Sequence, residues 1–461
     1  MPDKSVLDSD EPLPVMVWVY GGAFRVGGNG IPLYDGTNLV AHSIKRKKPV
    51  IVVVLNYRLN YFGFLASKEL KEEIDNDPSL TGEQKAVGNW GLQDQKMAFL
   101  WVHDHIAAFH GNKNDITAFG ESAGAISIAY HMMMPAHHGL FHRAIIQSGG
   151  VLTLPTQNIE HQCQKAFDAL CTQLGIPKET PAAEKLARLR ATPEKAISDV
   201  VDSDLTTMFS ATVDGVLIDG AAQSWFSDAS RLDPGVKKVL VGVNKDEGTL
   251  FSYSFNLKGD NWEVMRSRFG PDHEMDNFEK IYVRPAKGDS EAFVQVNTQI
   301  LGDLLFHAPI LTFASMVVEA PHVDASLYLF DCEVGTFEEK FRGIGAAHGF
   351  DLLYMFDSPP CRMLLSEQEA VMSKEVQNVW LEFATSSAKD IVPVVRQLWP
   401  ASGEKNVIHF RRDLTVGRSD VHWIAKEKYD YWVRFFDYQL KRMAQGDFDS
   451  HGFKFGDNER N

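Results

Sequence analysis

The sequence predicts an α/β fold in which a mostly parallel sheet is covered by helices on both faces. Several short runs are apolar at successive positions rather than at alternate ones. Continuous apolar character is typical of strands that are buried on both faces, as in a parallel sheet between two helical layers. The five clearest runs are Val15–Tyr20, Val50–Leu55, Ala144–Ile146, Val239–Val243 and Leu327–Phe330.

Helices are predicted between and after these strands, because apolar residues recur there at the spacing of one helix face. Residues 91–110 would bury one stripe made of Leu92, Phe99, Val102, Ile106 and Phe109. A second stripe near the C-terminus is made of Tyr429, Trp432, Val433, Phe436, Leu440 and Met443. Gly446 is suited to end this helix.

The chain is expected to form a single large domain over residues 1–461. It contains no internal repeat, no low-complexity tract and no linker-like stretch, and single α/β domains often exceed the average domain length. Residues 156–233 and 251–324 are helical or irregular in pattern. We expect these two segments to leave the sheet as helical excursions that form a gorge or cap.

The charge balance is acidic. The chain has 61 Asp and Glu against 46 Lys and Arg, a net charge of −15, which argues against a nucleic-acid partner. The one basic run, Lys45–Lys48, precedes a predicted strand and is interpreted as a solvated helix end. No apolar run approaches the length needed to cross a bilayer, so no transmembrane segment is predicted.

The cysteine pattern favours a reducing, intracellular setting. Cys163, Cys171, Cys332 and Cys361 show neither a CxxC motif nor metal-ligand spacing, and the chain has no Asn-x-Ser/Thr glycosylation site. The histidines of HDH (103–105) and HHGLFH (137–142) invite a zinc interpretation, but no third ligand follows at a suitable spacing. We therefore expect no metal and no cofactor.

Gly120-Glu121-Ser122-Ala123-Gly124 fits the GxSxG pattern of a nucleophile elbow. An apolar strand, 116–119, precedes it and a helical run, 125–134, follows it. At such an elbow the backbone of the serine is strained, and the residues two before and two after it crowd together, so glycine is needed at both. Ser122 is therefore predicted to be a nucleophile lifted clear of the sheet.

A second glycine-rich turn, Tyr20-Gly21-Gly22-Ala23-Phe24, directly follows the first predicted strand. Small residues leave backbone N–H groups free to approach a ligand, so the amides of Gly22 and Ala23, with that of Ala123, are candidates for an oxyanion hole. A phosphate-binding loop is the alternative interpretation. Against it, no GK[ST] closes the loop, the glycines miss GxGxxG spacing, and Pro32 follows.

The sequence resembles the type B carboxylesterase and cholinesterase family, a branch of the α/β-hydrolases. The resemblance extends from about Leu13 to the C-terminus. It is carried by the blocks LPVMVWVYGGAF, LNYRLNYFGFLAS, GNWGLQDQKMAFLWVHDHIAAFHGN, ITAFGESAGA, GLFHRAIIQSGG, VGVNKDEGTLF and AAHGFDLLYMF.

The resemblance implies a catalytic triad of Ser122, Glu247 and His348, the acid from the NKDEG block and the base from the AHGFD block. It also implies a buried carboxylate at Glu121 beside the nucleophile and a supporting serine, Ser148, close to the acid. A structural ion pair is implied between Arg58 of NYRLNYFGF and Asp94 of LQDQ.

The implied activity is carboxylic ester hydrolysis through an acyl-enzyme, on a small-molecule ester. Val151, Leu152, Leu154 and Phe251 would add apolar wall to the pocket. The family carries a long N-terminal stretch ahead of the LPVMVW strand, and this sequence starts just before that strand. We therefore expect an N-terminally truncated chain with an unpaired sheet edge and uncovered apolar surface. The alternatives are a truncated, inactive product and a non-catalytic cholinesterase-like binding module, and within the enzyme class a lipase, a lactonase or an amidase.

Overall fold

The predicted sheet is present in the structure, a computed structural model. The model describes residues 1–3, 10–204, 206–254, 257, 259–270, 274–341, 343–385, 394–399, 406–420 and 423–444. Within these residues, eight strands form one sheet in the order β10-β9-β8-β7-β4-β3-β1-β2. The strands are β1 (Leu13–Val19), β2 (Ile51–Val54), β3 (Gly111–Glu121), β4 (Arg143–Gln147), β7 (Lys238–Asn244), β8 (Asp324–Phe330), β9 (Val407–Phe410) and β10 (Val416–Ser419).

The sheet is parallel except at one edge, where β9 and β10 pair antiparallel. The sequence did not reveal β9 and β10, whose four residues each are too few for a clear pattern. At the other edge of the described sheet, β2 pairs with β1, and Val52, Val53 and Val54 are partly buried. This differs from the expectation that the strand is covered on both faces.

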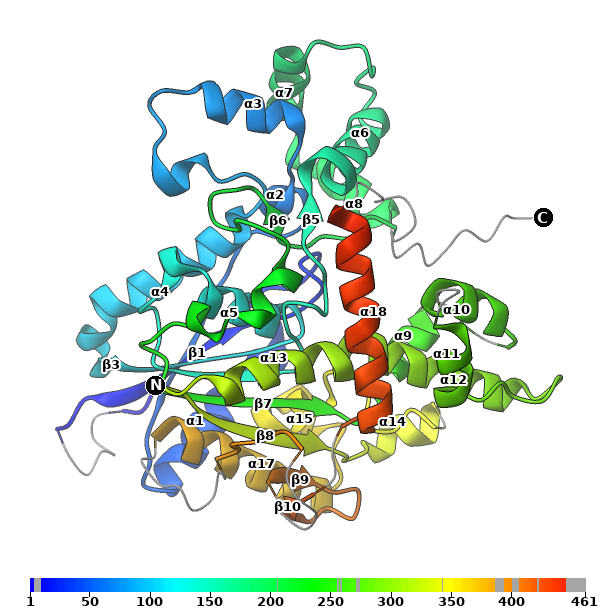
Figure 1. The fold of residues 1–461 in the computed structure, drawn as a ribbon. Helices are drawn as coiled ribbons and strands as arrows, with labels where there is room; N and C mark the ends of the chain where they lie inside the picture. Colours follow the sequence, from blue (N-terminus) through cyan, green and yellow to red (C-terminus); the bar gives the residue numbers. More distant parts are fainter. Residues whose placement is uncertain are drawn as a thin grey trace.

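Helices cover both faces of the sheet (Figure 1). One face is packed by α4 (Trp90–His105), α5 (Ala123–Met133) and α13 (Ala308–Glu319), and the other by α1 (Thr37–Lys45), α15 (Phe350–Phe356) and α17 (Glu367–Thr385). Every residue of α5 is buried, because this helix lies against β3 and β4 in the centre of the molecule. The fold class predicted from the sequence is confirmed.

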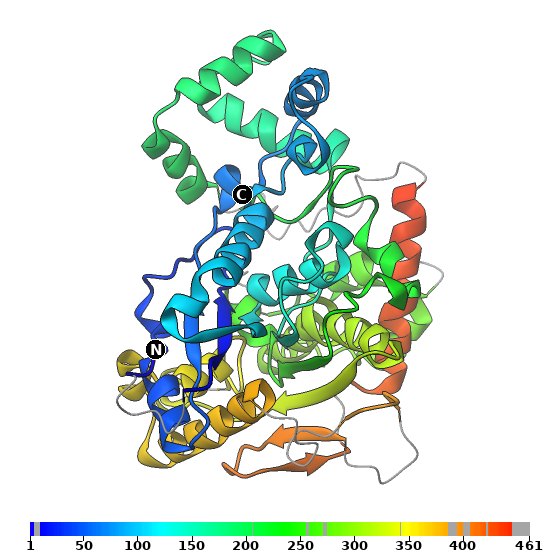
Figure 2. The same ribbon diagram turned by 90° about the vertical axis from the view of Figure 1, so that its left-hand side faces the viewer.

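The two predicted excursions are also helical. The first forms a lobe that stands away from the sheet together with α2 (Asn60–Phe64) and α3 (Lys68–Asn76) (Figure 2). It contains β5 (Gln157–Asn158), α6 (Gln164–Gln173), α7 (Ala182–Ala191), α8 (Glu194–Ser203) and β6 (Thr212–Val213). The second contains α9 (Gly248–Ser254), α10 (Trp262–Phe269), α11 (Met275–Ile281), α12 (Ser290–Gly302) and α13. The remaining helices are α14 (Gly335–Lys340), α16 (Pro359–Arg362) and α18 (Lys426–Ala444).

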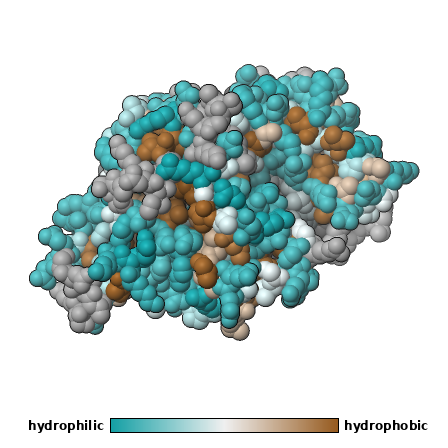
Figure 3. Space-filling view, turned by 90° about the horizontal axis from the view of Figure 1, so that it is seen from below, coloured by the Kyte–Doolittle hydropathy of each residue, from teal (hydrophilic) through white to brown (hydrophobic). Residues whose placement is uncertain are grey.

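Helices α12 and α13 are joined by a π-helical turn, Asp303–His307, into one run over residues 290–319. Among the described residues, this run is long and apolar enough to cross a bilayer by length and composition, which the sequence reading had missed. However, 83% of its most apolar window is buried inside the fold, as expected of a core helix. The outer face seen from below is mainly hydrophilic, with apolar residues scattered in small groups (Figure 3).

Two predicted helix faces need correction. Leu92, Phe99, Val102 and Ile106 are buried, but Phe109 is 42% exposed. The α-helix ends at His105 and the chain continues as a 3₁₀ turn, whose tighter winding turns Phe109 outward. On α18, Trp432 is buried as predicted, but its neighbours in the core are Tyr431 and Phe435, while the rest of the predicted stripe that can be judged is only half-buried. Gly446 lies outside the described residues.

Candidate active site

Ser122 lies in the turn between β3 and α5, with φ 54° and ψ −124°. A non-glycine residue at positive φ costs about 1–3 kcal/mol, so the surrounding fold must impose this geometry. A Cβ atom on Gly120 would lie 2.8 Å from the carbonyl carbon of Gly124, and one on Gly124 would lie 1.9 Å from the Val19 oxygen. The predicted crowding of the two glycines across the elbow is therefore confirmed.

The glycine-rich turn after β1 touches this elbow. A Cβ atom on Gly21 would lie 2.7 Å from the Glu121 oxygen and 2.9 Å from the Ser122 Cβ. Gly22 and Ala23 both have positive φ, of 110° and 55°, and within the described residues neither amide donates a hydrogen bond. The Ala123 amide opens α5, and the first N–H groups of a helix have no partner inside it.

Glu247 and His348 are brought together by two neighbouring strand ends. The loop after β7 and the segment before α15 join in an isolated parallel bridge between Asp246 and Ala347, the residues just before this pair. His348 Nδ1 then lies 2.6 Å from Glu247 Oε2. The Asn244 amide donates to Glu247 Oε1 at 2.7 Å, so both oxygens of this fully buried carboxylate have a partner.

The other ring nitrogen of His348 faces Glu121. His348 Nε2 lies 3.0 Å from Glu121 Oε1, and among the described residues no hydrogen bond joins His348 to Ser122 Oγ. The rings of Phe306 and Phe251 lie against the imidazole, at 4.4 and 5.3 Å between ring centres. Ser122 at the elbow, Glu247 and His348 thus lie in one region of the fold. Glu121 occupies the position beside His348 Nε2, the ring nitrogen that does not contact Glu247.

Three buried carboxyl groups surround this single imidazole and shift the protonation of the site. Burial by itself lowers the pKa of His348, but the charges of Glu121, Glu247 and Asp351 outweigh it and raise the pKa to about 9. Burial raises the pKa of Glu121 to about 8, although His348 opposes the shift. Burial also raises the pKa of Asp351. The site therefore holds protons more tightly than the same groups would in water.

Asp351 is a site residue that the sequence reading did not single out. It is fully buried, accepts hydrogen bonds from Gln147 Nε2 at 2.8 Å and Tyr328 OH at 3.2 Å, and lies one turn beyond His348. An acid in the HGFD block was the available signal. Ser148 directly follows β4, and its buried Oγ makes no hydrogen bond in the described part of the chain. Its supporting role beside the acid stays a prediction.

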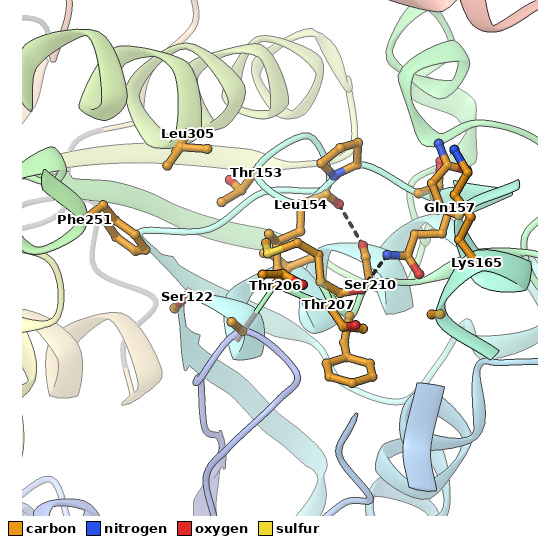
Figure 4. Close-up of a pocket in the computed structure, with 18 of the residues that line it drawn as sticks. Ser122, Thr153, Leu154, Gln157, Lys165, Thr206, Thr207, Ser210, Phe251 and Leu305 are labelled. Carbon is orange, nitrogen blue, oxygen red and sulfur yellow. Dashed lines mark hydrogen bonds between the residues drawn. The ribbon is translucent and has the colours of Figure 1, made fainter. Parts of the chain in front are cut away.

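A cavity of about 380 Å³ opens onto the elbow. Ser122 and Ala23 line one end, with Phe251, Leu305 and Phe306 beside them. Figure 4 shows Ser122 and Phe251 at one end of this pocket and Gln157 and Lys165 at the other. Of the four residues predicted to add apolar wall, Leu154 and Phe251 line the cavity, whereas Val151 and Leu152 are buried behind it.

The ion pair implied between Arg58 and Asp94 can be checked in the structure. Arg58 and Asp94 form the predicted ion pair, with the guanidinium donating to both carboxylate oxygens at 2.7 and 2.8 Å. Among the described residues, no group of three His, Cys, Asp or Glu side chains could hold a metal ion. The four cysteines are buried and unpaired.

Comparison with known proteins explains why these parts occur together. The sequence matches the model of the Carboxylesterase family over residues 2–432. This chain belongs to the carboxylesterase family. It is 30% identical to a cholinesterase of Mus musculus over 414 residues, which cover 84% of this chain and 64% of the mouse protein. The family member described here therefore spans less than two thirds of that relative's length.

Other relatives are esterases by name. The chain is 28% identical to the para-nitrobenzyl esterase of Bacillus subtilis (strain 168), over 85% of this chain and 74% of that protein. It is also 28% identical to carboxylesterase 1C of Rattus norvegicus, over 82% of this chain and 66% of that protein. A solved PNB esterase structure superposes with a TM-score of 0.70 at 26% identity, covering 92% of this chain and 83% of that one.

Proposed function

We propose that this chain hydrolyses carboxylic esters through an acyl-enzyme formed on Ser122, with His348 as base and Glu247 as its orienting acid, in one domain spanning the chain. Membership of the carboxylesterase family supports ester substrates. The observation that carries the residue assignment is the 2.6 Å contact between Glu247 and His348 Nδ1 next to a strained serine that lines a cavity.

In the proposed reaction, His348 Nε2 accepts the hydroxyl proton of Ser122 as its oxygen attacks the acyl carbon. The amides of Gly22, Ala23 and Ala123 donate to the developing oxyanion, each worth about 10²–10³ in rate. The imidazolium returns the proton to the leaving alcohol, and an acyl-serine remains. Water then attacks that acyl group in the same way and releases the acid and the free serine.

The contact between His348 Nε2 and Glu121 gives this reaction a preceding step. The imidazole must move its Nε2 from Glu121 Oε1 toward Ser122 Oγ, and catalytic hydrogen bonds often tighten only when substrate binds. Because the pKa of His348 is raised to about 9, the imidazole must also lose a proton before it can act as a base. The acid limb of the rate profile should therefore lie above the pKa of about 6.5 for an ordinary histidine.

The test is Ser122→Ala. We expect this variant to lose turnover of 4-nitrophenyl acyl esters and labelling by a fluorophosphonate probe, while its circular dichroism and thermal unfolding stay close to those of the parent. Ser127→Ala is the matched control, since Ser127 is buried on the same helix one turn further along. Undiminished hydrolysis by Ser122→Ala would reject the assignment, and a parent chain that the probe does not label would favour an inactive product or a binding module.

A further inference from the structure

A second buried histidine lies behind the proposed acid. His307 is 7% exposed and ends the π-helical turn Asp303–His307 between α12 and α13. Short π-helical turns are often found at functional sites. This one directs Leu305 and Phe306 into the cavity, and Asp303 and His307 contact groups outside it. The proposed mechanism gives His307 no role, so its contacts need a separate account.

The hydrogen bonds of His307 restrict its protonation state. Nε2 lies 3.2 Å from the Asn244 carbonyl oxygen, which can only accept, so this nitrogen carries a proton. Nδ1 lies 2.9 Å from Asp303 Oδ1. If Asp303 is ionised, that oxygen also only accepts, and both ring nitrogens are protonated. The charge of His307 thus depends on the state of Asp303.

The surroundings of Asp303 supply a hydrogen-bond donor and a positive charge. Trp432 Nε1 donates to the Tyr282 hydroxyl at 2.8 Å, and that hydroxyl donates to Asp303 Oδ2 at 2.7 Å. Lys428 Nζ, from α18, lies 3.5 Å from the same oxygen. Burial lowers the pKa of His307, but Asp303 and, less strongly, Glu247 raise it, and the net shift is upward. Among the described titratable groups, Asp303 and Glu247 act on this imidazole, and Tyr282 and Lys428 contact Asp303.

The ion pair reaches the proposed acid through Asn244. The carbonyl of Asn244 accepts from His307, its amide donates to Glu247 Oε1, and its side-chain amide donates to the Ala347 oxygen next to His348 at 2.7 Å. The loop is held from behind as well, because a Cβ atom on Gly248 would lie 1.9 Å from a carbonyl oxygen of α12. The positions of Glu247 and His348 therefore both depend on Asn244, the residue that His307 holds.

We propose that His307 is a protonated positioning residue, which with Asp303 forms a buried ion pair that fixes the Asn244–Glu247 loop. The inference rests on the proposed function, since it assigns His307 a task in service of the Glu247–His348 pair. Its physical basis is the accumulation of carboxyl groups at the site. Glu121, Glu247 and Asp351 repel one another, and a cation behind Asn244 offsets part of that repulsion.

The experiment reads the charge of His307 directly. On the full chain labelled with ¹⁵N-histidine, long-range ¹H–¹⁵N correlation spectra should show His307 with both nitrogens protonated from pH 6 to pH 8. The signal is assigned by its loss in His307→Gln, or in His307→Asn if the glutamine variant does not fold. A neutral His307 imidazole in the parent at pH 7 would overturn the proposal. This measurement needs no substrate, so it does not depend on esterase activity.

The same spectra measure the effect on the base. Removal of a nearby cation should raise the pKa of His348 by about half a unit to one unit in His307→Gln. The acid limb of kcat/KM should move upward by the same amount, with KM little changed. Tyr282→Phe is the matched control, because it removes one hydrogen bond to Asp303 and leaves the ion pair, so it should lower the melting temperature without shifting His348.

The outcomes separate this inference from the proposed function. An unshifted His348 in a folded His307→Gln protein would overturn the positioning role even if the parent hydrolyses esters. A doubly protonated His307 and a shifted His348 in a protein without esterase activity would support the positioning role and reject the proposed function instead.

Discussion

Buried histidines lie near both ends of helix α5, and their pKa values shift in opposite directions at the two ends. At the N-terminal end, His348 lies beside the Ser122 elbow among carboxyl groups, and its pKa is raised to about 9. At the C-terminal end, His131 lies against His137 with their Nδ1 atoms 2.7 Å apart. There burial lowers the pKa of His137 to about 3 and that of His131 far below its ordinary value.

The hydrogen bonds at the C-terminal end account for neutral histidines. Gln95 Nε2 donates to Ser127, so its Oε1 faces His131 Nε2 at 2.9 Å and must accept from it. His131 Nδ1 then accepts from His137 Nδ1, and His137 Nε2 is left buried without a hydrogen bond in the described chain. The nearest carboxylate oxygen, of Glu83, is 3.7 Å away and that side chain also binds Lys96.

The comparison shows that burial alone does not decide whether a histidine is charged. The dipole of α5 would favour a cation at its C-terminal end and disfavour one at its N-terminal end. The opposite is found, because the carboxyl groups around His348 outweigh both the dipole and the loss of water. The following predictions test whether counter-charges are the cause.

The largest effect is expected from removing the imidazole at the acidic site. His348→Asn should lower kcat for 4-nitrophenyl esters on the order of 10⁴–10⁶-fold, because the proposed base for Ser122 is lost. His137→Asn, at the other end of the helix, should leave kcat within a factor of about two. Steady-state kinetics on both variants check this, and comparable losses in the two would show that the sites do not differ in function.

A smaller effect is expected from removing one counter-charge. Glu121→Gln takes away the carboxylate that lies 3.0 Å from His348 Nε2, so the pKa of the base should fall. The acid limb of kcat/KM should move downward by about one unit, opposite in sign to the shift expected for His307→Gln.

The same variant should change stability at high pH. The pKa values of Glu121 and His348 are raised in the folded chain, so their stabilising effect is complete at low pH and is lost as pH rises through about 8 and 9. Glu121→Gln should flatten that loss in denaturant unfolding from pH 6 to pH 10. The counter-charge explanation would be contradicted if Glu121→Gln matched the parent in two respects, the acid limb of kcat/KM and the pH dependence of the unfolding free energy.

The smallest effect, a change in the pH dependence of stability, is expected at the neutral pair His131 and His137. The folded-state pKa of His137 is lowered to about 3, so the folded chain binds fewer protons than the unfolded chain between that pH and 6.5. Stability should therefore decline as pH falls through this window. His137→Asn keeps a donor at the Nδ1 position and should reduce the slope of unfolding free energy against pH by about one proton. Unfolding at pH 7, 6 and 5 measures the slope, and an unchanged slope would place the titration elsewhere.

Much of the fold could be predicted because the residue patterns that specify its strands and turns lie within short segments of the sequence. The five apolar runs all became strands of the sheet, and the glycines of the elbow lie where a side chain would collide with backbone. Phe109 and the outer face of α18 could not be predicted in the same way. Their exposure depends on where a helix tightens into a 3₁₀ turn and on which helices pack against it, and neither is encoded in periodicity.

By itself, the sequence determined the α/β order of elements, the strained serine and the glycine-rich turn after β1, and its resemblance to a known family pointed to Glu247 and His348. Only the tertiary structure decided how these groups are charged and which way they face. The approach of Glu121 to His348 Nε2, the Asp303–His307 pair behind Asn244 and the neutral pair at His131 all join residues from separate segments of the fold. Electrostatic interactions depend on distance in space and on the loss of water, and both are set only when the distant segments pack together.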